Sequence, residues 1–155
     1  MKRLLVDAEK CSGCRLCEMV CSFHHEKKFS PNLSRITVIK KDKYGLDSPI
    51  LCHQCEPCPA IDACPSDALT KNNLGVIQVD RETCTGCGAC VDACVFDAVK
   101  IDESLRPLLC DLCGGEPVCV ERCPTDALVF TNSEKVVEHP EEVFRGILRR
   151  WGIVG

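Results

Sequence analysis

The sequence predicts an α+β fold in which two fused modules carry short two-stranded sheets and an amphipathic helix follows at the C-terminus. Three observations predict it. Sixteen cysteines among 155 residues fall into four groups of four with none left over. A short tail, C-x-x-D-A-apolar, follows three of these groups. Around the groups, five short stretches alternate apolar and polar residues, which is the period of half-buried strands.

The cysteine groups have related but unequal spacings. Group one is Cys11, Cys14, Cys17 and Cys21, group two is Cys52, Cys55, Cys58 and Cys64, group three is Cys84, Cys87, Cys90 and Cys94, and group four is Cys110, Cys113, Cys119 and Cys123. Groups one and three have gaps of two, two and three residues, group two has two, two and five, and group four has two, five and three. The first pattern is the C-x2-C-x2-C-x3-C run that holds [4Fe-4S] clusters.

The repeated tail identifies the last cysteine of each irregular group. It reads CPSDAL after group two, CVFDAV after group three and CPTDAL after group four. This internal repeat aligns Cys64, Cys94 and Cys123 as one structural position. Cys64 therefore closes group two, Cys58 is its third cysteine, and residues 59–63 form an enlarged loop. Group one lacks the tail, so Cys21 is placed by spacing alone.

Disulfides and zinc could also account for so many cysteines. Disulfides persist in secreted proteins, but Leu4, Leu5 and Val6 are followed at once by Asp7, too short a run for a signal peptide. We therefore expect a cytoplasmic protein without a membrane span, in which cysteines bind metal. Structural zinc usually takes two C-x2-C pairs separated by a long loop, and a third cysteine at i+6 is not typical of it. A zinc-binding interaction module remains the minor alternative.

Composition agrees with bound metal and argues against nucleic acid. Five Phe, one Trp and one Tyr form a thin core, which metal ligation can stabilise because its free energy becomes folding free energy. The formal net charge is −4. Four clusters, each about −2 with its four thiolates, bring the holoprotein to about −12. Such a protein binds nucleic acid poorly.

Strands and helical turns are expected in a regular order between the cysteines. The alternating stretches cover residues 3–7, 35–41, 76–80, 98–102 and 127–131. Short helical turns are expected over residues 15–24, 60–64, 88–94 and 118–123, each delivering the last cysteine of its group. The cysteines themselves then lie largely on loops between these elements.

The C-terminal segment has a helix signature. Pro140 followed by two glutamates marks a helix start, and three arginines lie late in the helix, where cations suit its dipole. Phe144, Ile147, Leu148 and Trp151 form one apolar stripe. The sequence leaves two interpretations: the stripe packs on the protein's own body, or it docks on a partner or another copy of the chain.

Two other features have both a structural and a functional interpretation. The segment 24–43 is rich in lysine, which suits a solvated, protected edge strand or a docking surface for an acidic partner. The histidines His24, His25, His53 and His139 are candidate ligands, but sixteen cysteines already complete four sites. We expect surface or hydrogen-bonded histidines, with His24 and His25 close enough to Cys21 to tune a potential through hydrogen bonds.

The cysteine runs and their tails, over residues 11–130, resemble those of polyferredoxin electron-transfer subunits with four [4Fe-4S] clusters. These include the iron–sulfur subunits of the dimethyl-sulfoxide reductase class and the small partners of tungsten aldehyde oxidoreductases. The resemblance implies two bacterial-type two-[4Fe-4S] ferredoxin-like modules. We expect an outer module of residues 1–23 plus 103–131, a basic linker of residues 24–50, an inner module of residues 51–102 and a docking tail of residues 132–155.

The resemblance also implies a crossed pairing, because the closing cysteine of one run ligates the neighbouring run's cluster in two-cluster ferredoxins. The interval from Cys64 to Cys84 matches that inside one such ferredoxin, so groups two and three are paired, as are groups one and four. The implied sets are Cys11/Cys14/Cys17/Cys123, Cys110/Cys113/Cys119/Cys21, Cys52/Cys55/Cys58/Cys94 and Cys84/Cys87/Cys90/Cys64. Sequential pairing, one with two and three with four, is the alternative.

The functional expectation is electron transfer without catalysis. The sequence contains no dinucleotide fingerprint, phosphate loop, nucleophile elbow or acid–base constellation. The resemblance implies a large tungsten or molybdenum pterin subunit as partner, most plausibly aldehyde-oxidising, with a soluble carrier or a further flavin or ferredoxin acceptor at the other end. Its alternative is a free-standing polyferredoxin. The amphipathic tail also permits end-to-end self-association.

Overall fold

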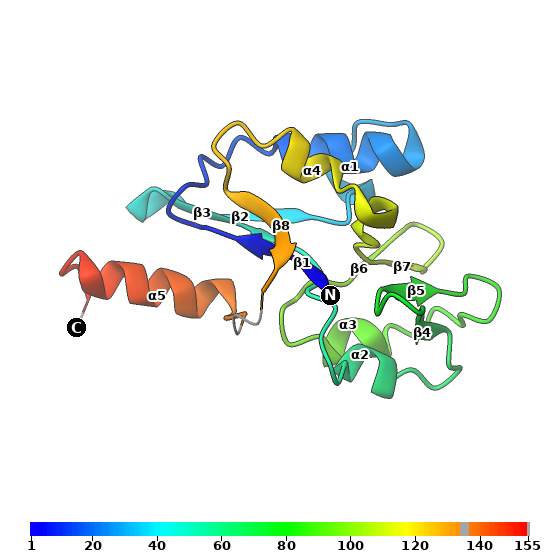
Figure 1. Ribbon diagram of the computed structural model, residues 1–155. Helices are drawn as coiled ribbons and strands as arrows, with labels where there is room; N and C mark the ends of the chain where they lie inside the picture. Colours follow the sequence, from blue (N-terminus) through cyan, green and yellow to red (C-terminus); the bar gives the residue numbers. More distant parts are fainter. Residues whose placement is uncertain (134–136, 155) are drawn as a thin grey trace.

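The computed structural model describes residues 1–133 and 137–154. The described chain forms two neighbouring halves (Figure 1). One half holds α1 (Leu16–Glu26), α4 (Val118–Glu121), β1 (Lys2–Val6), β8 (Leu128–Asn132), β2 (Thr37–Lys41) and β3 (Leu46–Ile50). The other holds α2 (Pro59–Asp62), α3 (Ala89–Ala93), β4 (Leu69–Lys71), β5 (Ile77–Val79), β6 (Lys100–Ile101) and β7 (Pro107–Leu108).

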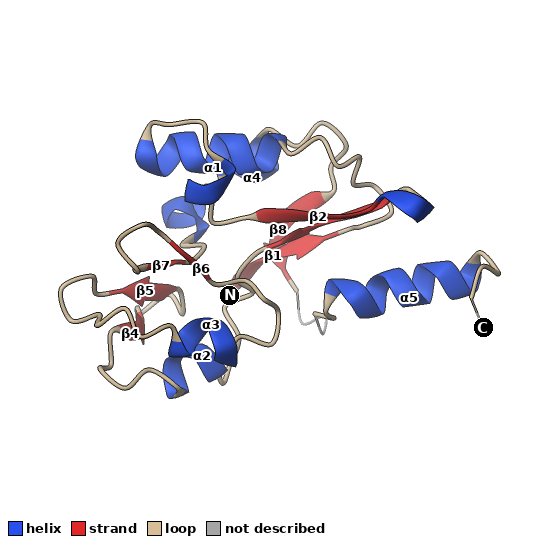
Figure 2. Cartoon of the chain, turned by 180° about the vertical axis from the view of Figure 1, so that it is seen from behind, coloured by secondary structure: helices blue, strands red, loops and turns tan. Residues whose placement is uncertain are grey.

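All strands of the described chain pair antiparallel in two-stranded sheets, as the sequence predicts for an α+β fold. The sheets are β1–β8, β2–β3, β4–β5 and β6–β7. The β1–β8 sheet joins the two ends of the cysteine-bearing region, with Leu4 opposite Phe130. Helices α1 and α4 pack together beside this sheet, and α2 packs against α3 in the other half (Figure 2).

The predicted elements are found with shifted ends, and three strands were not predicted. Strand β6 covers only two of the five residues expected at 98–102. Its partner strand begins at Pro107, which has no N–H to extend the ladder. Strands β3, β4 and β7 are too short or too polar to show a period-two pattern. The short 3₁₀ turns η1 (Pro31–Leu33), η2 (Asp42–Tyr44) and η3 (Leu112–Gly115) were also not predicted.

One continuous core of aliphatic side chains and cysteines runs through both halves. Leu4, Ile36 and Leu51 are almost fully buried, and they belong to the same cluster as Cys52 and Cys110. The cysteines are thus core residues as well as candidate ligands. Packing and metal ligation therefore stabilise the same region of the molecule.

Helix α5 (Pro140–Arg150) lies against the β2–β3 side of the first half (Figure 1). Its Phe144, Ile147 and Leu148 are buried against Ala8 and Leu46. The apolar stripe therefore packs on the protein's own body, which is the first of the two interpretations that the sequence left open. Trp151 was wrongly included in it, since Trp151 lies beyond the last helical turn and is 50% exposed. The other expectations for the tail fall partly on residues 134–136 and 155, which lie outside the described residues.

Ion pairs and caps hold α5 in place. Lys41 Nζ lies 2.7 Å from Glu141 and Arg150 lies 2.8 Å from Glu9, one contact at each end of the helix. The ring of His139 accepts a hydrogen bond from the Glu141 N–H, and Pro140 occupies the first helical turn. Among the described residues, no helix combines the length and apolar character required to cross a membrane.

Phe144→Ala tests how far the packing of α5 contributes to stability. The substitution leaves a cavity under the helix, so we expect a loss of about 3 kcal/mol in the free energy of unfolding. Anaerobic denaturant unfolding of the holoprotein measures it. Arg149→Ala, an exposed position on the same helix, is the control and should change little. Equal stability of both variants would contradict the role of this packing.

Candidate metal centres

All sixteen cysteine thiols are free of disulfides. The fold brings them together in four places, each with three thiols from one run and one from another run. We name each set by the cysteine that comes from elsewhere: the Cys123 set, the Cys64 set, the Cys94 set and the Cys21 set. Their assignment as cluster ligands stays a prediction, and the geometry on which it depends is described first.

The Cys123 set lines a small cavity at the start of α1. Cys11, Cys14 and Cys17 come from the loop before and the first turn of α1, and Cys123 comes from the turn after α4. Val38 and Leu128 complete the apolar wall. Two segments more than one hundred residues apart in the chain therefore share one cavity.

The Cys64 set repeats this arrangement in the other half. Cys84, Cys87 and Cys90 precede or begin α3, and Cys64 follows α2. These four thiols line a second small cavity with Ile101 and Leu105.

Electrostatic neighbours define the other two sets. Burial, together with the neighbouring thiols Cys58, Cys55 and Cys94, raises the pKa of the Cys52 thiol to about 12. Burial likewise raises the pKa of Cys119 to about 12, with contributions from Cys113 and Cys21 and, after them, from Cys17 of the Cys123 set. Burial raises the pKa of Cys110 well above its ordinary value, and Cys119 and Cys21 add to the effect.

The raised pKa values of these buried thiols indicate whether the sites suit a metal. A buried thiol resists ionisation because the anion loses its hydration and faces other sulfurs. A cationic core bound by all four sulfurs removes this penalty, since it supplies the missing positive charge. Four converging sulfurs therefore fit an iron–sulfur cluster or a zinc ion, and the geometry alone does not separate the two.

The aspartate of the repeated tail shapes the backbone around the closing cysteines. Asp67, Asp97 and Asp126 all adopt a left-handed conformation, with φ of 54°, 52° and 52°. Aspartate tolerates this conformation better than most residues. The C-x-x-D pattern is thus the signature of a left-handed turn, a structural role that was not predicted from the sequence.

This turn aims hydrogen-bond donors at Cys64 and Cys123. Burial tends to raise the pKa of each thiol, but donors outweigh it and lower both pKa values. At Cys64 the donors are the N–H groups of Ser66, Ala68 and Leu69 and the Ser66 hydroxyl. The corresponding residues after Cys123 act in the same way. Such donors stabilise a thiolate ligand.

The sets lie in a row. One turn of helix, α2, separates Cys58 of the Cys94 set from Cys64 of the Cys64 set. Cys52 lies close enough to Cys110 to raise the pKa of the Cys110 thiol, which links the Cys94 and Cys21 sets across the two halves. Helix α1 carries Cys17 and Cys21, which links the Cys21 and Cys123 sets. The order is therefore Cys64, Cys94, Cys21, Cys123.

Gln54 bridges the two halves at the middle of this row. Its Nε2 donates to the Cys110 carbonyl at 2.6 Å, and its Oε1 accepts from the Ile77 N–H at 2.7 Å. The side chain is 2% exposed. A second buried polar residue, Glu18, accepts from the Val38 N–H at 2.6 Å and joins α1 to β2. Neither was predicted from the sequence, because polar residues beside cysteines carry no periodic signal.

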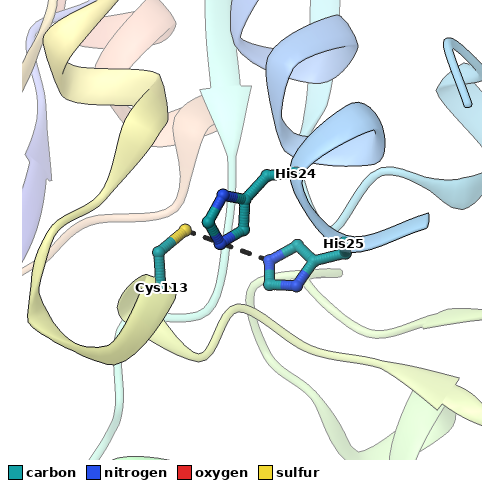
Figure 3. Close-up of side chains that lie close together, drawn as sticks. All are labelled: His24, His25 and Cys113. Atoms are coloured by element: carbon teal, nitrogen blue, oxygen red, sulfur yellow. Dashed lines mark hydrogen bonds between the residues drawn. The ribbon is translucent and has the colours of Figure 1, made fainter. Parts of the chain in front are cut away.

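The four histidines occupy three different environments, because His24 and His25 lie together. His25 Nε2 lies 3.9 Å from Cys113 Sγ, and one nitrogen from each of His24 and His25 lies within 4.8 Å of that sulfur and of each other (Figure 3). His53 is buried edge-on against Phe96, and burial lowers its pKa to about 4. His139 caps α5.

A charged network surrounds the His25–Cys113 contact. The Arg35 guanidinium contacts His25 Nδ1 and lies 3.3 Å from Asp111. The Arg35 N–H also donates to Cys21 Sγ at 3.3 Å. Burial, with Arg35 as the next cause, lowers the pKa of His25. The two histidines thus sit beside group four as well as Cys21, and their influence on a potential stays a prediction.

Four-sulfur sets in an α+β fold with paired halves define a metal-binding protein of ferredoxin-like architecture, and the comparisons decide between iron–sulfur clusters and zinc. Comparison with known proteins indicates clusters: residues 45–133 match the 4Fe-4S dicluster domain and residues 4–24 match the 4Fe-4S binding domain. The chain belongs to this family of polyferredoxin-like electron-transfer proteins, and its cofactors are [4Fe-4S] clusters, for which sixteen cysteines provide four sites.

Several relatives carry names from redox metabolism. The chain is 41% identical to YsaA of Escherichia coli, named for an inferred role in electron transport, over 88% of this chain and 93% of the relative. It is 43% identical to the polyferredoxin-like subunit of aliphatic sulfonate oxidoreductase of Pyrococcus furiosus, over 77% and 70%. It is 32% identical to the B subunit of polysulfide reductase of Wolinella succinogenes, over 82% and 74%.

A solved structure shares the arrangement along the whole chain. It is a chain of the active site complex BamBC of benzoyl coenzyme A reductase, with a TM-score of 0.52 and 26% identity, covering 100% of this chain and 93% of that chain. The relatives thus include subunits of oxidoreductases with different substrates.

Gln54→Met tests the bridge between the halves. The substitution keeps the side-chain volume but leaves the buried Cys110 carbonyl and Ile77 N–H without their partner, at about 1–3 kcal/mol for each group. We expect faster loss of visible absorption under denaturant than in the parent protein. Gln78→Met, an exposed position on β5, is the matched control. Equal bleaching rates in the two variants would show that the bridge contributes nothing.

Proposed function

We propose that the chain is a non-catalytic relay subunit that carries single electrons through four [4Fe-4S] clusters between a catalytic subunit and a second redox protein. The observation that carries the proposal is the row of four-thiol sets, each closed by a cysteine from another run. Each cluster, when bound, accepts and releases one electron. The sets are Cys11/Cys14/Cys17/Cys123, Cys110/Cys113/Cys119/Cys21, Cys52/Cys55/Cys58/Cys94 and Cys84/Cys87/Cys90/Cys64.

The burial of the cysteines supports a relay with two ends. Cys14 and Cys87 are exposed, and they belong to the first and last sets of the row. Cys52 and Cys110, at the centre, are buried. Electrons would enter and leave where a sulfur is exposed, while the middle sets contain only buried and half-buried cysteines. The chain's own contribution is spacing, burial and hydrogen bonding.

The division into modules is part of this proposal. The outer module comprises residues 1–23 and 103–131, and the inner module comprises residues 51–102. Pairing of β1 with β8 and of α1 with α4 supports the outer module, and packing of α2 on α3 supports the inner one, while the β6–β7 sheet joins residues on both sides of the boundary between them. Residues 24–50 form the linker and residues 132–155 the tail.

The catalytic partner we propose is a tungsten or molybdenum pterin subunit, aldehyde-oxidising by the resemblance of the cysteine runs. Relatives that are named as subunits of oxidoreductases support a catalytic partner. Their different substrates indicate that the partner, rather than this chain, determines the reaction. Assignment of all sixteen cysteines to clusters supports a non-catalytic role. Sixteen cysteines free of disulfides support a cytoplasmic location.

The crossed sets are tested by single cysteine substitutions. The parent protein should contain about sixteen irons and as many labile sulfides, and Cys64→Ser should perturb the same cluster as Cys90→Ser. EPR and Mössbauer spectra of each purified variant identify the cluster affected. Cys58→Ser, in the same run as Cys64, is the comparison. Spectra of Cys64→Ser that match Cys58→Ser instead would overturn the crossed pairing, and about four zincs in place of iron would overturn the clusters.

The proposed catalytic partner is tested by isolating the complex from the native organism. Anaerobic affinity purification of the tagged full chain should bring down a larger subunit, with tungsten or molybdenum in the fraction by elemental analysis. The purified complex should reduce its iron–sulfur centres when given an aldehyde. Isolation of the chain alone, with full iron content, would favour a free-standing polyferredoxin instead.

A further inference from the structure

The residue two positions after each closing cysteine differs within the repeat. It is Ser66 after Cys64 and Thr125 after Cys123, but Phe96 after Cys94. The Ser66 hydroxyl oxygen lies 3.7 Å from Cys64 Sγ, and the Thr125 hydroxyl oxygen lies 3.8 Å from Cys123 Sγ. These are hydrogen-bonding distances for sulfur, and the two contacts are equivalent in the two halves.

The hydroxyl must be the donor in both contacts when the cysteine is a metal ligand. A ligating cysteine is a thiolate and has no proton to give. A donor near the sulfur stabilises negative charge, and a reduced set carries one more negative charge than an oxidised set. The hydroxyl therefore favours the reduced form and raises the potential.

Phe96 removes this donor from the Cys94 set. Its ring packs edge-on against His53, with centroids 4.9 Å apart, and it carries no hydroxyl. The Cys21 set, whose run lacks the repeat, obtains donors from another segment: the Arg35 N–H and the Ser34 hydroxyl lie beside Cys21. The Cys94 set is thus the one whose closing cysteine is followed by the repeat but not by a hydroxyl.

Burial of the cysteines also favours a lower potential for the Cys94 set than for the two end sets. The Cys94 set has two buried and two half-buried cysteines, whereas each end set has one buried, two half-buried and one exposed cysteine. Exposure to water stabilises the more negative reduced form, and burial disfavours it.

We propose that the residue two positions after the closing cysteine orders the potentials along the row: Ser66 and Thr125 raise those of the two end sets, and Phe96 keeps that of the Cys94 set below both. Electrons then rest on the end sets, next to the surface, and occupy the Cys94 set only in transit. The inference rests on the proposed cysteine sets and adds positioning residues to them.

The test compares Ser66→Ala, Thr125→Val and the reverse change Phe96→Ser in the full holoprotein. Reduction at a series of fixed potentials, followed by EPR, gives the ratio of reduced to oxidised form for each centre. At a fixed potential we expect this ratio to fall about threefold for one end centre in Ser66→Ala and in Thr125→Val, the two variants that lose a hydroxyl. A threefold change corresponds to a fraction of the net free energy of one hydrogen bond. Phe96→Ser should raise it by about the same factor for one buried centre.

Two controls separate a hydrogen bond from a packing effect. Thr125→Ser keeps the hydroxyl and should keep the parent potential. Thr70→Val makes the same kind of change at an exposed position on β4 and should move nothing. Solvent-exchangeable proton couplings to the end centres should weaken in Ser66→Ala and Thr125→Val, which a change in packing alone would not cause.

The outcomes distinguish this inference from the proposed function. Iron well below about sixteen in the parent protein would contradict the four sets themselves. Full iron with unmoved potentials in all three variants would overturn only the present inference. If the two loss variants lose iron, Phe96→Ser decides: a raised potential supports the inference and an unchanged one overturns it.

Discussion

Convergence of four thiols, at least one of them buried, on one cationic group is the interaction on which the rest of the structure depends. Burial raises the pKa of Cys52 and Cys119 to about 12 and that of Cys110 well above its ordinary value, so these sulfurs ionise readily only with a metal core beside them. The same cysteines belong to the hydrophobic core, which is otherwise built mainly from aliphatic residues. Binding the clusters and completing the core are therefore one thermodynamic event.

Each thiol set combines cysteines from two separate runs, and this arrangement ties distant segments of the chain together. Each short helix from α1 to α4 lies next to a closing cysteine, so α1 packs on α4 and α2 on α3. Pairing of β1 with β8 closes the first half around a chain segment that contains the second half. Gln54 then joins the halves through its buried hydrogen bond to the Cys110 carbonyl, and its second buried hydrogen bond, to Ile77, anchors it within its own half. A row of sets follows from this connectivity without any large sheet.

Much of the fold was predictable, because the cysteines impose a repeat that can be read directly. The fold class and the family of electron-transfer proteins are confirmed, and α5 begins at Pro140 as its cap and charge pattern indicate. The failures are local. Trp151 continues the helical spacing, but the helix ends before it and leaves it exposed. Strands of two or three residues have too few side chains to show a period, so β4 and β7 could not be distinguished from loops.

The sequence by itself determined the number of sulfur donors and their grouping in fours, and it predicted the closing cysteines, because spacing and the C-x-x-D-A tail are local properties of the chain. Only the tertiary structure decided what lies around those cysteines. It brought Cys123 to the loop of Cys11, placed Cys110 beside Cys52 and aimed the hydroxyls of Ser66 and Thr125 at sulfur. These relations join residues that are distant in sequence or depend on a left-handed turn, and packing rather than composition fixes both.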